Sequence, residues 1–164
     1  MIHSERVHRY IPATAGSPDL WWLAGRLTIK VQGADTDGRF AQFVIDDPRG
    51  TSAPLHVHSQ EDEEFVVLEG RIRFVAGGQE IEAEEGGIVF LPRGVPHTYL
   101  VLSDNARALV TMAPAGAERF FMELGVPVEP GSPRPDLPPP TMEAMGRAAA
   151  PYGIELVGPP LSLD

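Results

Sequence analysis

Three histidines and one glutamate occupy two short blocks of this sequence at spacings that fit a single metal site: His56, His58, Glu63 and His97. His56 and His58 are two residues apart, so on an extended strand their side chains leave from the same face. His97 returns in the second block, just after a Pro-x-Gly turn. Neutral imidazoles and one carboxylate suit a divalent first-row metal ion, with the remaining positions open to solvent or substrate. Because the chain has no cysteine, such a site is built from nitrogen and oxygen ligands alone.

The other charged and histidine residues near these blocks have a simpler interpretation. Acidic side chains in a flexible stretch are usually solvated, and histidines of a terminal segment rarely carry chemistry. We therefore expect the following residues to lie on the surface without a role in the site: Glu61, Asp62, Glu64, Arg93, His3 and His8.

Composition limits the classes of protein that fit. A chain of 164 residues with 43% hydrophobic residues predicts one globular domain, 1–164. The formal net charge of -10, with scattered arginines, argues against a nucleic-acid partner and an anionic membrane surface. No apolar run reaches the length of a membrane span, and no secretory signal is visible, so we expect a cytoplasmic protein.

The middle of the chain predicts closely spaced β-strands separated by glycine and proline turns. Alternating segments such as RIRF and QEIEAE are typical of strands with one buried face. No βαβ alternation is visible, so the pattern favours an antiparallel sandwich or barrel. The expected strands are 22–32, 39–45, 55–58, 64–68, 71–76, 79–84, 88–91, 98–102 and 106–113.

The character of the sequence changes after Pro114. We expect the barrel core to occupy about 20–114 and a helical, proline-rich extension to occupy 115–164. Within the extension, GAERFFMELG predicts a short helix with Phe120, Phe121 and Leu124 on one face. Residues 126–140 are too rich in proline for a helix, whereas Thr141 can cap a second helix that stops at Pro151. The extension is too small for its own core and should pack on the barrel or on a partner subunit.

The two blocks also resemble the signature motifs of the cupin superfamily. Residues 50–70 read Gly-x5-His-x-His-x4-Glu-x6-Gly, and residues 86–97 read Gly-x5-Pro-x-Gly-x2-His. One element departs from the family pattern, because Val101 stands where cupins often have an asparagine that is not a ligand. The resemblance implies an all-β, antiparallel jelly-roll β-barrel with one divalent metal ion (Fe, Mn, Ni, Cu, Co or Zn). Its ligands would be His56, His58, Glu63 and His97.

Segments outside the motifs are similar to single-domain quercetin 2,3-dioxygenase-like cupins: WWLAGRLTIKV, HSQEDEEFVVLEG, GAERFFMELGVP and YGIELVGPP. This likeness implies an oxidoreductase that opens a flavonol, or a related oxygen-chelating aromatic, with dioxygen. It also implies Glu63 as catalytic base and a homodimer. Two alternatives stay open: a non-redox metal cupin such as an isomerase, epimerase-like enzyme or lyase, and a module that binds a small molecule without turnover. A full set of four ligands favours an enzyme over a bare binding module.

A jelly-roll interior offers alternate strand residues to a ligand. The candidates for the pocket wall are Phe43, Phe74, Phe90, Tyr99 and Met112, with Trp21, Trp22, Phe120 and Phe121 as covers. The competing interpretation for each of them is ordinary core packing, since apolar residues at strand period usually fill the core.

Overall fold

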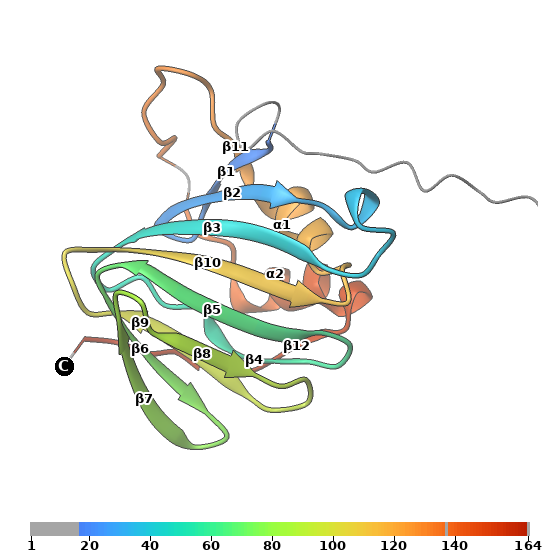
Figure 1. Ribbon diagram of the computed structural model, residues 1–164. Coiled ribbons are helices and arrows are strands. Elements are labelled where there is room, and N and C mark those ends of the chain that lie inside the picture. Colours follow the sequence, from blue (N-terminus) through green and yellow to red (C-terminus); the bar gives the residue numbers. More distant parts are fainter. Residues whose placement is uncertain (1–16, 137, 164) are drawn as a thin grey trace, which may run out of the picture.

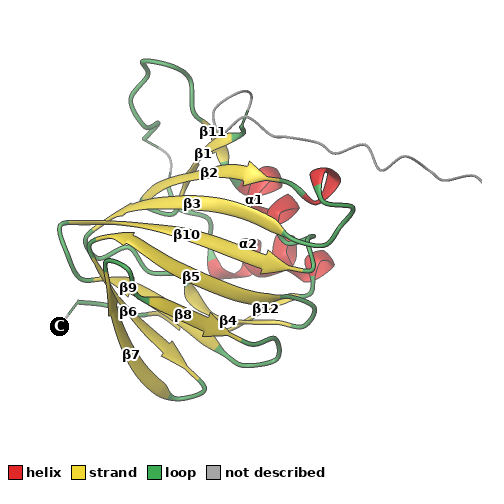
Figure 2. Ribbon diagram, in the orientation of Figure 1, coloured by secondary structure: helices red, strands yellow, loops and turns green. Residues whose placement is uncertain are grey.

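The structure is a computed structural model that describes residues 17–136 and 138–163, so His3 and His8 lie outside the described residues. The described residues form two antiparallel sheets, with helices gathered on one side (Figures 1 and 2). The seven-stranded sheet has the order β11 (Val126–Pro127), β1 (Asp19–Trp22), β2 (Gly25–Val31), β3 (Ala41–Pro48), β10 (Asn105–Ala113), β5 (Asp62–Glu69) and β8 (Ile88–Leu91). The five-stranded sheet has the order β12 (Ile154–Pro160), β4 (Pro54–His58), β9 (His97–Val101), β6 (Arg71–Ala76) and β7 (Gln79–Glu84).

The two sheets pack face to face around one apolar core. Alternate residues of β3, β5 and β10 are buried, as expected for strands that turn one face inward. Phe65 of β5 meets Phe74 of β6 edge to face, with ring centroids 5.0 Å apart, and so joins the two layers. This two-layer antiparallel architecture confirms the predicted jelly-roll class.

Two short helices cover one end of the core. These are α1 (Glu118–Leu124) and α2 (Met142–Ala149), and single 3-10 turns occur at Gly33–Asp35 and Ala150–Tyr152. The predicted cap is confirmed, because the backbone N–H of Ala144 donates to Thr141 Oγ1 at 3.2 Å. The helices pack against the same core as the strands through three side chains, Phe120, Phe121 and Met145. No helix among the described residues is long and apolar enough to cross a membrane.

The strand predictions need two corrections. The predicted strand 22–32 covers β2 but only the last residue of β1, because the chain turns back between Trp22 and Gly25, with Leu23 at a positive φ of 48°. The strand β12 escaped prediction, because its glycine and two prolines are typical of a loop. It is an edge strand, where missing backbone donors are tolerated, and it pairs with β4.

Candidate metal centre

The two sheets each contribute to a cluster of four side chains, three of them buried and that of His56 partly buried. His56 and His58 come from β4, and His97 begins β9, where it pairs directly opposite His56. Glu63 comes from β5 in the facing sheet. One ligand atom of each residue lies within 4.8 Å of all the others. The structure therefore brings together all four residues that the sequence singled out.

Close contacts link the cluster internally. Glu63 Oε2 lies 3.0 Å from His97 Nε2 and 3.9 Å from His58 Nε2. The rings of His58 and His97 are nearly parallel, with centroids 5.4 Å apart, and His56 meets His97 edge-on at 4.4 Å. A single buried carboxylate thus faces three imidazoles, of which those of His58 and His97 are also buried.

The outer nitrogens of two of the rings are fixed by the backbone. His56 Nδ1 lies 2.7 Å from the carbonyl oxygen of Pro54, and His97 Nδ1 lies 2.9 Å from that of Val95. A carbonyl oxygen only accepts, so each Nδ1 carries a proton and donates it. Hydrogen bonds of this kind fix the orientation of a ligating ring and leave Nε2 to face the metal.

Burial and mutual proximity shift the protonation of these groups. Burial and the neighbouring imidazoles lower the pKa of His56 to about 3, so its ring is neutral. Burial alone would raise the pKa of Glu63, but the hydrogen bond from His97 and the nearby imidazoles lower it below its usual value. Burial acts to lower the pKa of His97, yet the bond to Glu63 raises it. The cluster therefore holds an ionised carboxylate and at least one neutral imidazole, the forms in which these groups ligate a metal.

The donor set fits a divalent first-row metal ion. Both ring nitrogens of His58 are buried without a hydrogen-bond partner. Burying an unpaired nitrogen costs free energy unless another group, such as a metal ion, binds it. A metal ion between the four side chains would take up His58 Nε2 and offset the charge of Glu63. Three imidazoles and one carboxylate are a donor set that suits such an ion.

Glu61 corrects the sequence analysis. We expected it to be solvated, but its exposed fraction is 2%, and its Oε2 lies 3.5 Å from His58 Nδ1. The sequence signal was available, since Glu61 precedes Glu63 by two residues and so shares its inward face. Asp62 and Glu64 are only partly buried, as expected of the opposite face.

Arg93 lies on the surface, as predicted, and binds Asp62 rather than the cluster. Its Nη2 is 2.7 Å from Asp62 Oδ2, and its backbone N–H also donates to that carboxylate. These hydrogen bonds lower the pKa of Asp62 to about 2. Arg93 thus braces the outer side of the segment that carries Glu63.

The cluster borders an apolar cavity of about 60 Å³ in the interior of the sandwich. Four of the five predicted wall residues line it: Phe43, Phe74, Tyr99 and Met112. Of the predicted covers, Trp22, Phe120 and Phe121 also line it, whereas Trp21 does not. The helices therefore close one side of the space in front of the four side chains.

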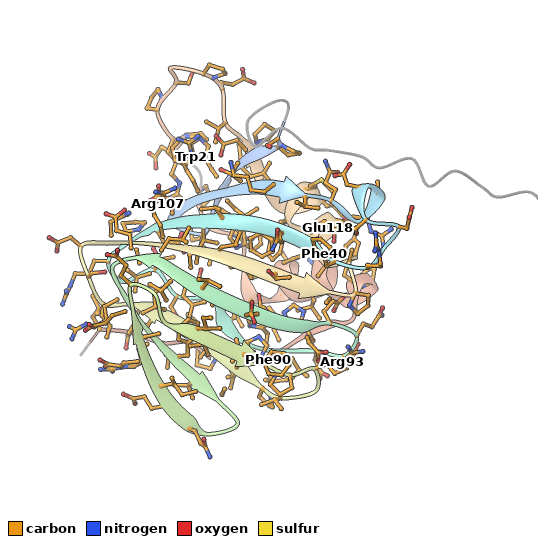
Figure 3. All side chains as sticks on the ribbon, in the orientation of Figure 1. Trp21, Phe40, Phe90, Arg93, Arg107 and Glu118 are labelled. Atoms are coloured by element: carbon orange, nitrogen blue, oxygen red, sulfur yellow. The ribbon has the colours of Figure 1, made fainter. Side chains whose placement is uncertain are left out.

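The assignment of Phe90 to the pocket wall is wrong. Phe90 pairs with Glu64 on the outward face of β8 and is 59% exposed, while its neighbours Val89 and Leu91 turn inward. Figure 3 shows Phe90 on the outer side of the strand, with Arg93 just beyond its end. A continuous apolar run such as IVFL does not reveal which alternate residues face the core, because both sets are hydrophobic.

A second buried polar pair lies beside the cavity, and sequence reasoning missed it. The Tyr99 hydroxyl donates to Asp47 Oδ2 at 2.8 Å, and Asp47 is 1% exposed. Burial raises the pKa of Asp47 to about 7, against the opposing effect of the Tyr99 hydrogen bond. The acidic DDPRG segment reads as a turn, so nothing in it distinguishes a buried aspartate from a solvated one.

Comparison with known proteins gives the same class as the geometry. Residues 42–113 match the family model described as a cupin domain. Residues 42–113 therefore carry a cupin domain. The sequence is similar to quercetin 2,3-dioxygenase of Bacillus subtilis, with 32% identity over 95 residues. That match covers 58% of this chain but only 28% of the enzyme.

Other similarities are more distant. The chain is 27% identical over 95 residues to an uncharacterized protein of Streptomyces coelicolor, covering 52% of this chain and 90% of that protein. Among solved structures, KdgF from Halomonas sp. has a TM-score of 0.53 at 14% identity, covering 58% of this chain and 85% of that one. Oxalate decarboxylase of Bacillus subtilis has a TM-score of 0.58 at 19% identity, covering 66% of this chain and 30% of that one. At these identities the structures show a shared fold alone.

Proposed function

We propose that this protein is a metal-dependent cupin enzyme of dioxygenase type, acting with dioxygen on an oxygen-chelating aromatic or enol. The observation that carries the proposal is the cluster of three histidines and Glu63 at the edge of an apolar cavity. The sequence similarity to a quercetin 2,3-dioxygenase supports the reaction class, although the chain spans only 28% of that enzyme.

The ligands in this proposal are His56, His58, Glu63 and His97. When bound, the ion would supply Lewis acidity that lowers the pKa of a chelating hydroxyl group. The chain itself contributes the apolar walls, which exclude water and restrict the orientations in which a polar substrate can bind. Tyr99 and Thr98 are the other polar residues that border the cavity.

Glu63 is the proposed proton acceptor. Its pKa is lowered, so it is ionised at neutral pH and can take the proton of a bound hydroxyl group. Because a lowered pKa also makes it a weak base, it can act only on a hydroxyl group that is itself made acidic.

The size of the cavity restricts the substrate. Drug-sized ligands occupy pockets of roughly 300–1,000 Å³, whereas the free space here is about 60 Å³. A single water needs roughly 10–15 Å³ by a comparable measure, so the cavity as it stands suits a small chelating molecule. A flavonol would require Trp22 and Met145, which line the space from β1 and α2, to move outward.

Metal analysis followed by oxygen consumption tests the proposal. The purified protein should contain about one first-row metal ion per chain, and oxygen uptake should require both that ion and substrate. Quercetin and small catechols or enediols are compared, and the small compounds are expected to turn over faster. Metal-dependent conversion without oxygen uptake would instead establish the non-redox isomerase or lyase alternative. Binding without conversion would establish a binding module.

The proposed assembly is a homodimer through the outer face of β8. This strand ends the seven-stranded sheet, and its outward residues Ile88 and Phe90 are 64% and 59% exposed. The row continues across the sheet in register through Val66, Leu109 and Val44. An apolar row that reaches an open edge is the kind of surface that natural sheets cover.

A further inference from the structure

We infer that Glu61 is a positioning residue for His58: its carboxylate accepts the Nδ1 proton of that ring and so aims Nε2 at the metal. This inference rests on the metal centre proposed above and assigns a role to a residue outside the four ligands. It accounts for a buried acid that the ligand set leaves unexplained.

The geometry divides the two nitrogens of His58 between two carboxylates. Nε2 faces the cluster, 3.9 Å from Glu63 Oε2, and Nδ1 faces away from it, 3.5 Å from Glu61 Oε2. Among the described residues, the buried side-chain atoms without a hydrogen-bond partner are His58 Nδ1, His58 Nε2 and Glu61 Oε2. Two of these three atoms therefore face each other, about half an ångström beyond a typical N–H···O bond. A small rotation of the carboxyl group closes that gap.

The other two histidines show what His58 lacks. His56 and His97 each donate Nδ1–H to a backbone carbonyl two residues earlier in the chain, that of Pro54 and that of Val95. His58 has no such carbonyl partner, and the group nearest its Nδ1 is a side chain. Of the three histidines, His58 is therefore the one whose ring orientation can be changed by substituting a single neighbouring side chain.

The surroundings of Glu61 hold it beneath the segment that precedes α1. A Cβ placed at Gly116 would lie 3.4 Å from Glu61 Oε1, so that backbone covers the carboxylate closely. Burying a carboxylate costs several kcal/mol unless it is bonded or paired. A residue whose only role was to fill this space would be better apolar. The carboxylate is explained if it orients a metal-ligating ring, since such outer partners fix the tautomer of the histidine.

The first test is the tautomer of His58 in the metal-free protein, read from long-range proton–nitrogen correlation NMR of the histidine rings. The wild type is expected to carry the proton on Nδ1. Glu61→Gln keeps an oxygen acceptor and should preserve that tautomer, whereas Glu61→Leu should shift the proton to Nε2. Glu64→Leu, which removes an equal charge from the outer face of β5, is the control and should leave the tautomer unchanged.

The second test is the affinity for Co²⁺, measured by competition with a chelator. Glu61→Leu should weaken binding by about 10- to 100-fold, Glu61→Gln by much less, and Glu64→Leu not at all. Metal-free Glu61→Leu should unfold at a temperature at least as high as the wild type, which excludes misfolding as the cause of weak binding.

A wild-type His58 with its proton on Nε2, or a Glu61→Leu affinity within twofold of wild type, would overturn the inference. If the wild type bound no Co²⁺, the proposal of a metal centre would be contradicted. An Nδ1 proton that moves to Nε2 in Glu61→Leu would then still support the orientation of His58 by Glu61.

Discussion

Burial acts to raise the pKa of both buried acids beside the cavity, yet their net pKa shifts are opposite. Glu63 faces three imidazoles and keeps a lowered pKa, while Asp47 has one phenol for a partner and a raised one. The difference follows from the neighbours, because a positive or polarisable ring offsets the desolvation of a carboxylate more fully than a neutral hydroxyl group does. Residue type alone thus says little about the charge state inside this sandwich.

Glu63→Gln tests the role of Glu63 as proton acceptor. Glutamine retains the shape and one oxygen ligand but cannot take a proton, so turnover should fall by about 10²–10⁴-fold with metal still bound. Steady-state rates are measured beside metal content, with Glu64→Gln as the control of equal charge change. Full turnover of a metal-loaded Glu63→Gln would show that another group accepts the proton.

Asp47→Asn tests the buried pair with Tyr99. The folded-state pKa of Asp47 is about 7 against a usual 3.8, so the folded protein binds the extra proton between these values. The contribution of Asp47 to stability is therefore full below pH 3.8 and is lost as the pH rises through about 7. Asparagine cannot ionise and can still accept from Tyr99.

The variant should match the wild type near pH 4 and exceed it at pH 8 by a few kcal/mol, on the scale of about 1.4 kcal/mol per pKa unit. Denaturant unfolding at both pH values measures this difference. A difference that is independent of pH would contradict the raised pKa.

At the scale of elements, two glycines predict opposite responses to the same change. A Cβ on Gly146, inside α2, would lie 3.9 Å from its nearest neighbour, Leu156, in ordinary contact. Gly146→Ala should therefore stabilise the protein by about 0.5–1 kcal/mol. A Cβ on Gly25 would lie 2.1 Å from Asp47 Oδ1 and 2.4 Å from the backbone oxygen of Asp46, so Gly25→Ala should destabilise it. The unfolding temperatures of the two variants test this prediction. Shifts of the same sign in both unfolding temperatures would contradict this packing.

Most of the elements were predictable because each short strand carries its own period-two pattern and its own turn. β6 and β8 have the predicted bounds, and the cap of α2 was readable from Thr141. The four clustered residues were predictable because their spacing is local to two blocks. Glu61, Asp47 and Phe90 were misjudged, because which face of a strand is buried, and against what, is set by the opposing sheet.

At the scale of the whole molecule, the proposed dimer predicts a mass of twice 17.7 kDa by light scattering. Replacing both Ile88 and Phe90 with glutamate should yield a monomer, because the charges would be buried in the interface. Val157→Glu is the control, since Val157 is 45% exposed on the edge strand of the other sheet. Dissociation by Val157→Glu instead would place the interface at β12.

The pairing of β12 with β4 has a consequence for biosynthesis. Residue Ile154 lies beside His58, and Ser59 bonds to Gly153, 94 residues further along the chain. While the polypeptide is being made, the histidine-bearing strand lacks its outer neighbour until the last described strand has left the ribosome. Metal capture should therefore be a late event in the life of the nascent chain, and a stop codon before residue 154 should abolish it even though all four ligands are present.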